Sequence, residues 1–489
     1  MANKALKGLP IIFIAVISCG VLSAHITPRD YNVKSHVEYL SCRELEGRVP
    51  ASRGDTLARN YIASYYSSSG LFPVIEGEYF QYFQFLHRIE ERTNPLLKVV
   101  SGNDTTSYEF KKDFVGDPRS QSGTAQGKAV FIGYGIHDVE YQYNDYDKIE
   151  LKNKIVFCFH HTPRDSTDER IRKLALADSY FQKIEMASSR GAVAFIYVMH
   201  GDDSPLTNVN SKYRDIIPGQ HFHQQSIPVL RIDYNAFSDI LIKGDCCIDD
   251  IKEKLRFRHS SQAFQIPNIS VSLSVDIQYR YETTCNIVGM IEGYNTRETV
   301  IIGAHYDHMG YDKRGRLRLG ANDNASGVAV LIELASLLSR AKPDCNYLFV
   351  AFGMEEWGCI GSKHFIRNIP ENIGRIKAMI NLDMVGRLRD DTMFLYHTQS
   401  AKEWPKYIEL SNDNKLDIVI MPNRSPSDSD IFNKEKIPAL FVYTGPDKIK
   451  NHANEHLFIN YDGMEKILDF TFKLVRLISL EGNKLTYQD

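Results

Sequence analysis

Residues 281–489 alternate short apolar runs with longer amphipathic stretches, and this alternation constrains the fold more than any other feature of the chain. The runs have the length of buried strands, and the stretches between them have the apolar spacing of helices. The expected strands are Asn286–Ile291, Thr299–Gly303, Tyr347–Phe352, Ala378–Leu382, Met393–Tyr396, Asp417–Met421 and Ala439–Tyr443, and the expected helices are Ala325–Ser339, Ser362–Asn368, Ala401–Asn412 and Gly463–Ser479. This pattern predicts an α/β fold, here a mixed, mostly parallel sheet with helices on both faces.

Residue types that bind metals follow the ends of these strands. His305 and Asp307 follow the strand at Thr299–Gly303, and Asp323 comes just before the next helix. The later candidates are Glu355 with Glu356, then Asp383, and then His452. Because ligands of open α/β sheets bind at the carboxyl ends of the strands, we expect these side chains to lie close together.

Two histidines and three carboxylates suit a pair of zinc ions, because imidazole and carboxylate both bind zinc and one aspartate can bridge two metals. A single histidine or aspartate after a strand is more often a cap or a surface group, so the recurrence along one sheet edge is what favours the site. Of two adjacent glutamates, one can bind metal while the other takes a proton from a water held between the ions. We therefore predict a hydrolytic centre with Glu355 as general base and with the metal ligands His305, Asp323, Glu356, Asp383 and His452.

The strings that carry these residues resemble a known enzyme family. They are similar to those of the co-catalytic di-zinc aminopeptidase family of clan MH, which includes bacterial aminopeptidases, glutamate carboxypeptidase and the transferrin receptor ectodomain. Glu44-Leu-Glu-Gly-Arg48 and Gly77-Glu-Tyr-Phe-Gln81 resemble the amino-terminal part of the same catalytic domain. The resemblance implies a zinc-dependent exopeptidase that acts on peptides, in the first place an aminopeptidase that hydrolyses N-terminal residues through a metal-bridging water.

The same resemblance implies roles for the individual residues. His305, Asp323 and Asp383 would bind one zinc, and Asp323, Glu356 and His452 would bind the other. The division of Glu356 and Asp383 between the two ions could also be the reverse. Asp307 would hydrogen-bond the second ring nitrogen of His305 and so fix its tautomer.

Two motifs depart from the family pattern. The last ligand of the family is usually in a Tyr-His pair followed by a proline and an aspartate, whereas this chain has Asn451-His452-Ala-Asn-Glu455-His456, so His456 competes with His452. Ser427-Asp428-Ser429-Asp430 resembles a motif that usually has histidine in place of Ser429. That loop lies near the substrate in relatives, so the departure leaves room for a different specificity.

Two alternatives to an aminopeptidase follow from the same resemblance. A carboxypeptidase of the glutamate type needs basic residues to hold a substrate carboxylate, and Arg387 or Arg424 could supply them. A non-catalytic receptor on the same fold is the other alternative, and it would be marked by the loss of metal ligands. All five ligands and the base are present in this chain, which favours the enzyme.

From Gly123 the sequence pattern changes to short β-runs around one helical stretch. Gly127–Gly135 and Leu151–Val156 are similar to a protease-associated domain. We therefore expect a catalytic domain in two parts, residues 31–115 and 281–489, with an inserted, smaller α/β protease-associated domain at residues 116–280.

The first eighteen residues have the pattern of an export signal. Lys4 and Lys7 precede the apolar run Leu9–Ile17, which is too short to span a bilayer. The run leads into Val16-Ile17-Ser18-Cys19, which resembles a bacterial lipobox. We expect a signal peptide at residues 1–18 and lipidation of Cys19, which would attach the exported protein to a membrane surface in the periplasm or on the cell; otherwise the protein would be secreted.

Charge excludes one class of partner. The 489-residue chain has a formal net charge of -3 and 43% hydrophobic residues. Removal of the signal peptide, which carries two lysines and no acid, makes the remaining chain more acidic. A chain without basic excess is not expected to bind nucleic acid.

Overall fold

The computed structural model describes residues 33–140, 142–160, 180–199, 224–257, 262–422, 425–445, 458–480, 482 and 484–488. The expected signal peptide, Cys19, Arg424, His452 and His456 lie outside these residues. The chain divides into two compact units. Unit 1 contains the described residues up to Gln84 and from Thr283 onward, and unit 2 runs from Phe85 to Glu282.

Unit 1 is built on a nine-stranded sheet with the order β1-β13-β15-β14-β16-β19-β17-β18, in which β2 also pairs with β13. Its strands are β1 (Phe72–Pro73), β2 (Phe80–Glu91), β13 (Ile277–Ile291), β14 (Asn295–His305), β15 (Cys345–Phe352), β16 (Arg375–Leu382), β17 (Thr392–Tyr396), β18 (Asp417–Ile420) and β19 (Ala439–Tyr443). The central strands β15, β14, β16 and β19 are parallel, β13 runs antiparallel to β15, and β17 runs antiparallel to β19 but parallel to β18. The predicted mixed, mostly parallel sheet is confirmed.

Both faces of this sheet are buried, which explains why its strands are continuously apolar. In β14, Ile302 joins a core on one face and Ile301 joins the core on the other, since successive side chains of a strand point to opposite faces. The same alternation places Phe349 of β15 with Ile302 and Val350 with Ile301. Helices therefore have to cover each side, and the predicted two-sided arrangement is confirmed.

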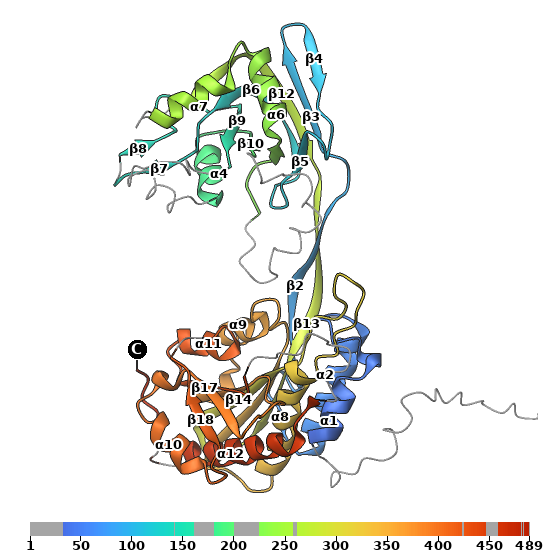
Figure 1. Cartoon of the computed structure of the whole chain (residues 1–489), viewed down its shortest axis with the longest axis vertical. Helices are drawn as coiled ribbons and strands as arrows, with labels where there is room; N and C mark the ends of the chain where they lie inside the picture. Colours follow the sequence, from blue (N-terminus) through green and yellow to red (C-terminus); the bar gives the residue numbers. More distant parts are fainter. Residues whose placement is uncertain are drawn as a thin grey trace, which may run out of the picture. The chain divides into compact units, whose positions relative to one another are not determined.

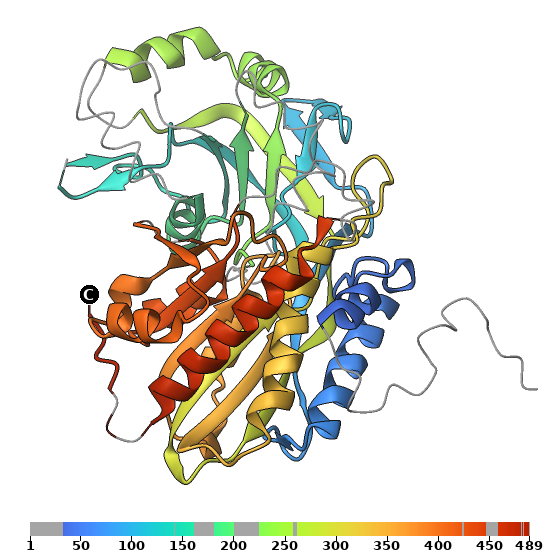
Figure 2. The same ribbon diagram turned by 60° about the horizontal axis from the view of Figure 1, so that its bottom comes forward.

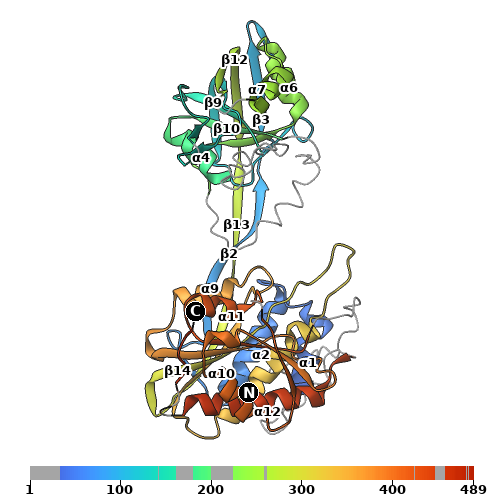
Figure 3. The same ribbon diagram turned by 60° about the vertical axis from the view of Figure 1, so that its left-hand side comes forward.

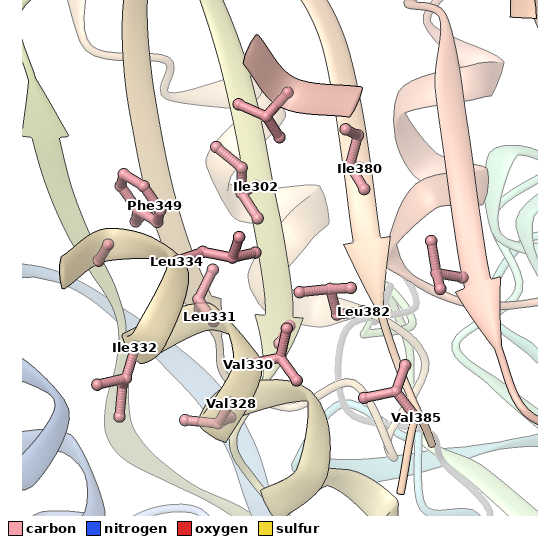
Figure 4. Packing of buried hydrophobic residues seen from close by; sticks show 14 of the residues in the cluster. Ile302, Val328, Val330, Leu331, Ile332, Leu334, Phe349, Ile380, Leu382 and Val385 are labelled. Carbon is pink, nitrogen blue, oxygen red and sulfur yellow. The ribbon is translucent and has the colours of Figure 1, made fainter. Parts of the chain in front are cut away.

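The larger core lies under α8 (Ser326–Leu338), α10 (Trp404–Ser411) and α12 (Tyr461–Ser479), with α1 (Val33–Leu40) and α2 (Arg53–Ser68) also packed against it. Figure 2 shows α8 and α12 side by side across this face of the sheet. Leu331 and Leu334 of α8 pack onto Phe349, Ile302 and Leu382 of the strands (Figure 4). On the opposite face α9 (Ile360–Arg367) and α11 (Asp428–Lys434) lie together (Figures 1 and 3).

The amino-terminal region of unit 1 contains two helices joined by a turn. The chain is helical in α1 and α2 but turns sharply between them, where a short 3-10 helix covers Arg43–Leu45. Glu46, Gly47 and Arg48 all have positive φ angles. A Cβ on Gly47 would lie 2.4 Å from the carbonyl oxygen of Arg318, so this close approach requires glycine. The turn directs Arg48 toward the loops that carry the site.

Unit 2 contains an eight-stranded sheet with the order β4-β3-β12-β6-β9-β10-β11-β5 and a two-stranded sheet of β7 and β8. Its strands are β3 (Leu96–Ser101), β4 (Asp104–Ser107), β5 (Phe114–Gly116), β6 (Gly123–Phe131), β7 (His137–Asp138), β8 (Tyr143–Asn144), β9 (Lys154–Phe159), β10 (Ala194–Val198), β11 (Val229–Ile232) and β12 (Phe264–Val275). One face is covered by α6 (Tyr234–Lys243) and α7 (Ile248–Phe257), and the other by α4 (Tyr180–Ser189).

The sequence places the start of the inserted domain at residue 116, whereas unit 2 begins at Phe85. The difference arises because β3 pairs with β12 and β5 pairs with β11, so both strands belong to the sheet of unit 2. At the other end, the expected boundary at residue 280 lies close to Glu282. Among the described residues, the structure contains no helix long and apolar enough to cross a membrane.

Candidate metal centre

The predicted site residues come together because three parallel strands end at one edge of the sheet of unit 1. β14 ends at His305, and it lies between β15, which precedes Glu355 and Glu356, and β16, which precedes Asp383. In the register, His305 pairs with Phe352, so the loops after β14 and β15 start level with each other. Residues far apart in the sequence are thus brought together by strand pairing alone.

The first group of donors consists of His305, Asp323 and Asp383. Nε2 of His305 lies 3.2 Å from Oδ1 of Asp323 and 3.2 Å from Oδ1 of Asp383. Zinc bonds of about 2.0–2.1 Å at tetrahedral angles place two donor atoms about 3.3 Å apart. The spacing of these three side chains therefore fits a zinc ion.

A second group consists of His308, Asp323 and Glu356, whose donor atoms lie within 4.8 Å of one another. Asp323 belongs to both groups, as a bridging carboxylate would. His308 Nδ1 lies 2.6 Å from Oε1 of Glu356. Two three-residue groups joined by one aspartate thus make a dinuclear arrangement of donors.

Negative charge exceeds positive charge in this cluster. Burial by itself would lower the pKa of His305, but Asp383 and Glu355 raise it more, so the pKa lies well above its ordinary value. Burial raises the pKa of Asp323 less than His305 and His308 lower it, and the resulting pKa is about 2. The carboxylates around the two histidines are Asp307, Asp323, Glu355, Glu356 and Asp383. Such an excess of acceptors favours bound cations.

Glu355 belongs to neither donor group. Its Oε2 lies 3.9 Å from Nε2 of His305, and its side chain is 14% exposed. Burial, together with the charges of Asp383, Asp428 and Glu356, raises the pKa of Glu355 well above its ordinary value against the influence of His305. A carboxylate beside the donors and outside both groups is placed as a proton acceptor must be.

Asp307 holds the loop that carries Glu355. Its Oδ1 accepts a hydrogen bond of 3.0 Å from the backbone N–H of Glu355. The carboxylate lies 3.8 Å from Nδ1 of His305, and the carbonyl oxygen of Asp307 is nearer to that nitrogen, at 3.3 Å. Asp307 is fully buried, which raises its pKa to about 6. The predicted contact with the second ring nitrogen of His305 is thus made by the backbone carbonyl of Asp307, whereas its carboxylate accepts from Glu355, a contact that the sequence did not indicate.

The loop that presents Asp323 is tied to the loop that presents Asp383. The side chain of Asn324 donates to the carbonyl of Leu382 at 2.9 Å and accepts from the backbone N–H groups of Gly327 and Met384. A Cβ on Gly327 would lie 2.3 Å from the carbonyl oxygen of Leu382, so only glycine allows α8 to begin this close to β16. The separation of Asp323 from Asp383 is therefore fixed by backbone contacts.

Ser427 orients the carboxylate of Asp383. Its hydroxyl donates to Oδ2 of Asp383 at 3.1 Å and accepts from the side chain of Asn381 at 2.9 Å. This contact leaves Oδ1 of Asp383 facing His305. Ser427 belongs to the motif that departs from the family pattern, and its role in positioning a ligand was not predicted from the sequence.

Arg48 is hydrogen-bonded to the backbone of the loop between β14 and α8. Its buried guanidinium donates hydrogen bonds to the backbone carbonyls of Leu40, Tyr306, Leu319 and Gly320. The carbonyls of Tyr306, Leu319 and Gly320 lie at the two ends of the loop that contains His308. The carbonyl of Leu40 lies at the end of α1. The Glu44–Arg48 motif thus acts on the site through the backbone.

Comparison with known proteins finds a family match over the region of the site. Residues 286–474 match the model of peptidase family M28. The matched range contains every predicted metal ligand and the predicted base, so the family match and the donor cluster fall in the same part of the chain.

Individual relatives agree with this match. The chain is 37% identical over 123 residues to an aminopeptidase of Pseudomonas aeruginosa (strain UCBPP-PA14), covering 25% of this chain and 22% of that protein. It is 40% identical over 89 residues to a probable zinc metalloprotease of Pyrenophora teres f. teres, covering 18% of this chain and 19% of that protein. The chain thus spans about a fifth of the length of these curated relatives.

A solved structure extends the likeness in fold. The aminopeptidase from Aneurinibacillus sp. strain AM-1 matches 94% of this chain and 95% of its own, with a TM-score of 0.51 and 21% sequence identity. At this identity the match shows the fold alone.

Four of the five predicted metal ligands lie in the two donor groups of unit 1: His305, Asp323, Glu356 and Asp383. His452 and the competing His456 lie outside the described residues. His308 was not predicted to take part. The sequence did contain an indication, because His308 is a third residue of metal-binding type in the run His305-Tyr-Asp307-His308.

Proposed function

We propose that the chain is a zinc-dependent exopeptidase, and specifically an aminopeptidase that hydrolyses N-terminal residues from peptides. The observation that carries the proposal is the sharing of Asp323 by two donor groups, with Glu355 beside them. The match to family M28, aminopeptidase relatives and a relative described as a probable zinc metalloprotease support it.

The proposal includes two zinc ions. The donors are imidazole nitrogen and carboxylate oxygen, which zinc accepts, and the 3.2 Å spacings around His305 match a tetrahedral zinc site. His305, Asp323 and Asp383 would hold one ion. Asp323 and Glu356, with His452 as the predicted nitrogen ligand, would hold the other.

The residues of the site divide the chemistry between them. Zinc bound at these residues would supply Lewis-acid polarisation of the scissile carbonyl and a more acidic water. Glu355 would take a proton from the attacking water and pass it to the leaving amine, and the backbone contact with Asp307 keeps the loop of Glu355 beside the donors. Carboxylates at the site bind the free amino group of the substrate, which is the recognition an aminopeptidase requires.

A substrate panel tests the proposal. Aminoacyl p-nitroanilides and N-acyl-glutamate peptides are offered to the zinc-loaded protein, to the chelated protein and to the chelated protein after zinc is restored. We expect cleavage of the aminoacyl substrates, loss of activity with chelator and recovery with zinc. Cleavage of the N-acyl-glutamate substrates alone would indicate a carboxypeptidase, and zinc binding without any cleavage would indicate a receptor-like protein.

Two further proposals rest on sequence. We propose that the protein is exported and lipidated at Cys19, and we propose that unit 2 is a protease-associated domain, on the strength of the strings at Gly127–Gly135 and Leu151–Val156. Mass spectrometry of the mature amino terminus tests the first of these. A diacylglycerol adduct on Cys19, absent in Cys19→Ser, is the expected result, and an unmodified amino terminus would contradict it.

A further inference from the structure

His308 is a buried histidine at the second donor group. Its side chain is 4% exposed, and its Nδ1 lies 2.6 Å from Oε1 of Glu356. Its Nε2 is buried and, within the described residues, has no hydrogen-bond partner. The backbone N–H of His308 contacts the carbonyl of Arg48, so the loop beneath the ring is anchored to a buried side chain. Together these contacts hold the imidazole at the site.

The composition of the second donor group repeats that of the first. In the first group His305 lies beside the carboxylates of Asp323 and Asp383. In the second group His308 lies beside those of Asp323 and Glu356. One neutral imidazole nitrogen and two carboxylate oxygens are a sufficient set of protein ligands for a zinc ion that retains a water. The described residues thus supply a nitrogen donor to each of the two groups.

We propose that His308 is a direct ligand of the second zinc ion, with Asp323 and Glu356. This inference rests on the proposed function only in requiring a two-metal centre. The 2.6 Å between Nδ1 of His308 and Oε1 of Glu356 is a hydrogen-bond distance. Donors on a tetrahedral zinc lie about 3.3 Å apart, so the pair opens by roughly 0.7 Å when a metal ion replaces the shared proton.

The alternative is that His308 only orients Glu356 by hydrogen bonding. The variants His308→Ala and His308→Gln separate the two roles, because a glutamine amide can donate a hydrogen bond to Glu356 but is a poor zinc ligand. His36→Gln is the matched control. His36 is also fully buried in unit 1 and lies 3.5 Å from a carboxylate, that of Glu333, in the helical layer.

The experiment measures bound zinc per chain at a series of buffered free zinc concentrations, using the full-length protein. We expect the starting protein and His36→Gln to fill both sites at the same free zinc concentrations, and both His308 variants to need a free zinc concentration more than about 100-fold higher to fill the second site, beyond the usual effect of a residue that only orients a ligand. A shift of less than about 100-fold in His308→Gln would overturn the proposal. Circular dichroism checks the folding of each variant, and if His308→Ala unfolds, His308→Gln decides.

Failure of the broader proposal gives a different result. If the starting protein binds no zinc at any concentration, the two-metal centre itself is refuted, whatever the His308 variants do. If the starting protein binds two ions and cleaves aminoacyl substrates while His308→Gln keeps both ions, only the role of His308 is refuted.

Discussion

Replacement of Glu355 by glutamine is the sharpest test of the proposed mechanism. The two side chains have the same shape, and the backbone N–H of Glu355, which donates to Asp307, is unchanged by the substitution. Glu355 lies outside both donor groups, so zinc should remain bound. The variant therefore removes a proton acceptor from an otherwise intact centre.

The expected loss follows from the role of a general base. Such a group contributes about 10²- to 10⁴-fold to the rate, which corresponds to about 2.7–5.5 kcal/mol in the transition state. Glu355 lies next to the donors, 3.9 Å from Nε2 of His305, and burial raises its pKa well above the ordinary value. We expect kcat to fall by this factor for an aminoacyl p-nitroanilide, with KM changed far less.

The neighbouring glutamate provides the control. Glu356→Gln removes a donor of the second group, so we expect it to lose one zinc ion, whereas Glu355→Gln should keep two when both are measured by atomic emission. Equal zinc contents and equal kcat values for the two variants would refute the division of labour between Glu355 and Glu356. Retained activity in Glu355→Gln would by itself refute the role of the base.

Three further predictions concern other parts of the chain. Ser427→Ala removes the hydrogen bond to Asp383 and should weaken zinc binding by about 10- to 100-fold, measured by competition with a chelating dye. Leu331→Ala, in the buried face of α8, should reduce the free energy of unfolding by about 2–5 kcal/mol in urea titrations, and the partly exposed Leu337→Ala should cost clearly less. Burial raises the pKa of Asp145 in unit 2 to about 7, so its contribution to stability is complete below about pH 4 and is lost as the pH rises through 7. Asp145→Asn should flatten this fall in urea midpoints between pH 4 and 7, and an unchanged slope would count against the burial effect.

The strands of unit 1 could be predicted because they are buried on both faces and are bounded by breaking residues. The run Ala439–Tyr443 was predicted with the bounds of β19, since Pro438 precedes it and Thr444-Gly445 follows it. The helix α11 was not predicted, because Ser427-Asp428-Ser429-Asp430 has the composition of a turn. Its helical form depends on packing, since Phe432 is fully buried against Phe352 and Phe365.

Unit 2 shows where local patterns were insufficient. The run Leu96–Val100 has the composition of a strand, but its partner β12 lies far along the chain. Pairing between such distant strands decides the unit to which a strand belongs. The apolar pattern of one sequence does not show which distant strand is the partner. The predicted start of the inserted domain, residue 116, is therefore later than the start of unit 2 at Phe85.

The sequence by itself determined the chemistry of the site. His305, Asp323, Glu356 and Asp383 could be predicted as ligands because metal-binding residue types recur where apolar runs end, and strand ends of one sheet share an edge. The tertiary structure decided which donors meet. His308 and Glu356 are 48 residues apart and come within hydrogen-bond distance because β14 pairs directly with β15, and that pairing is set by burial of the whole sheet.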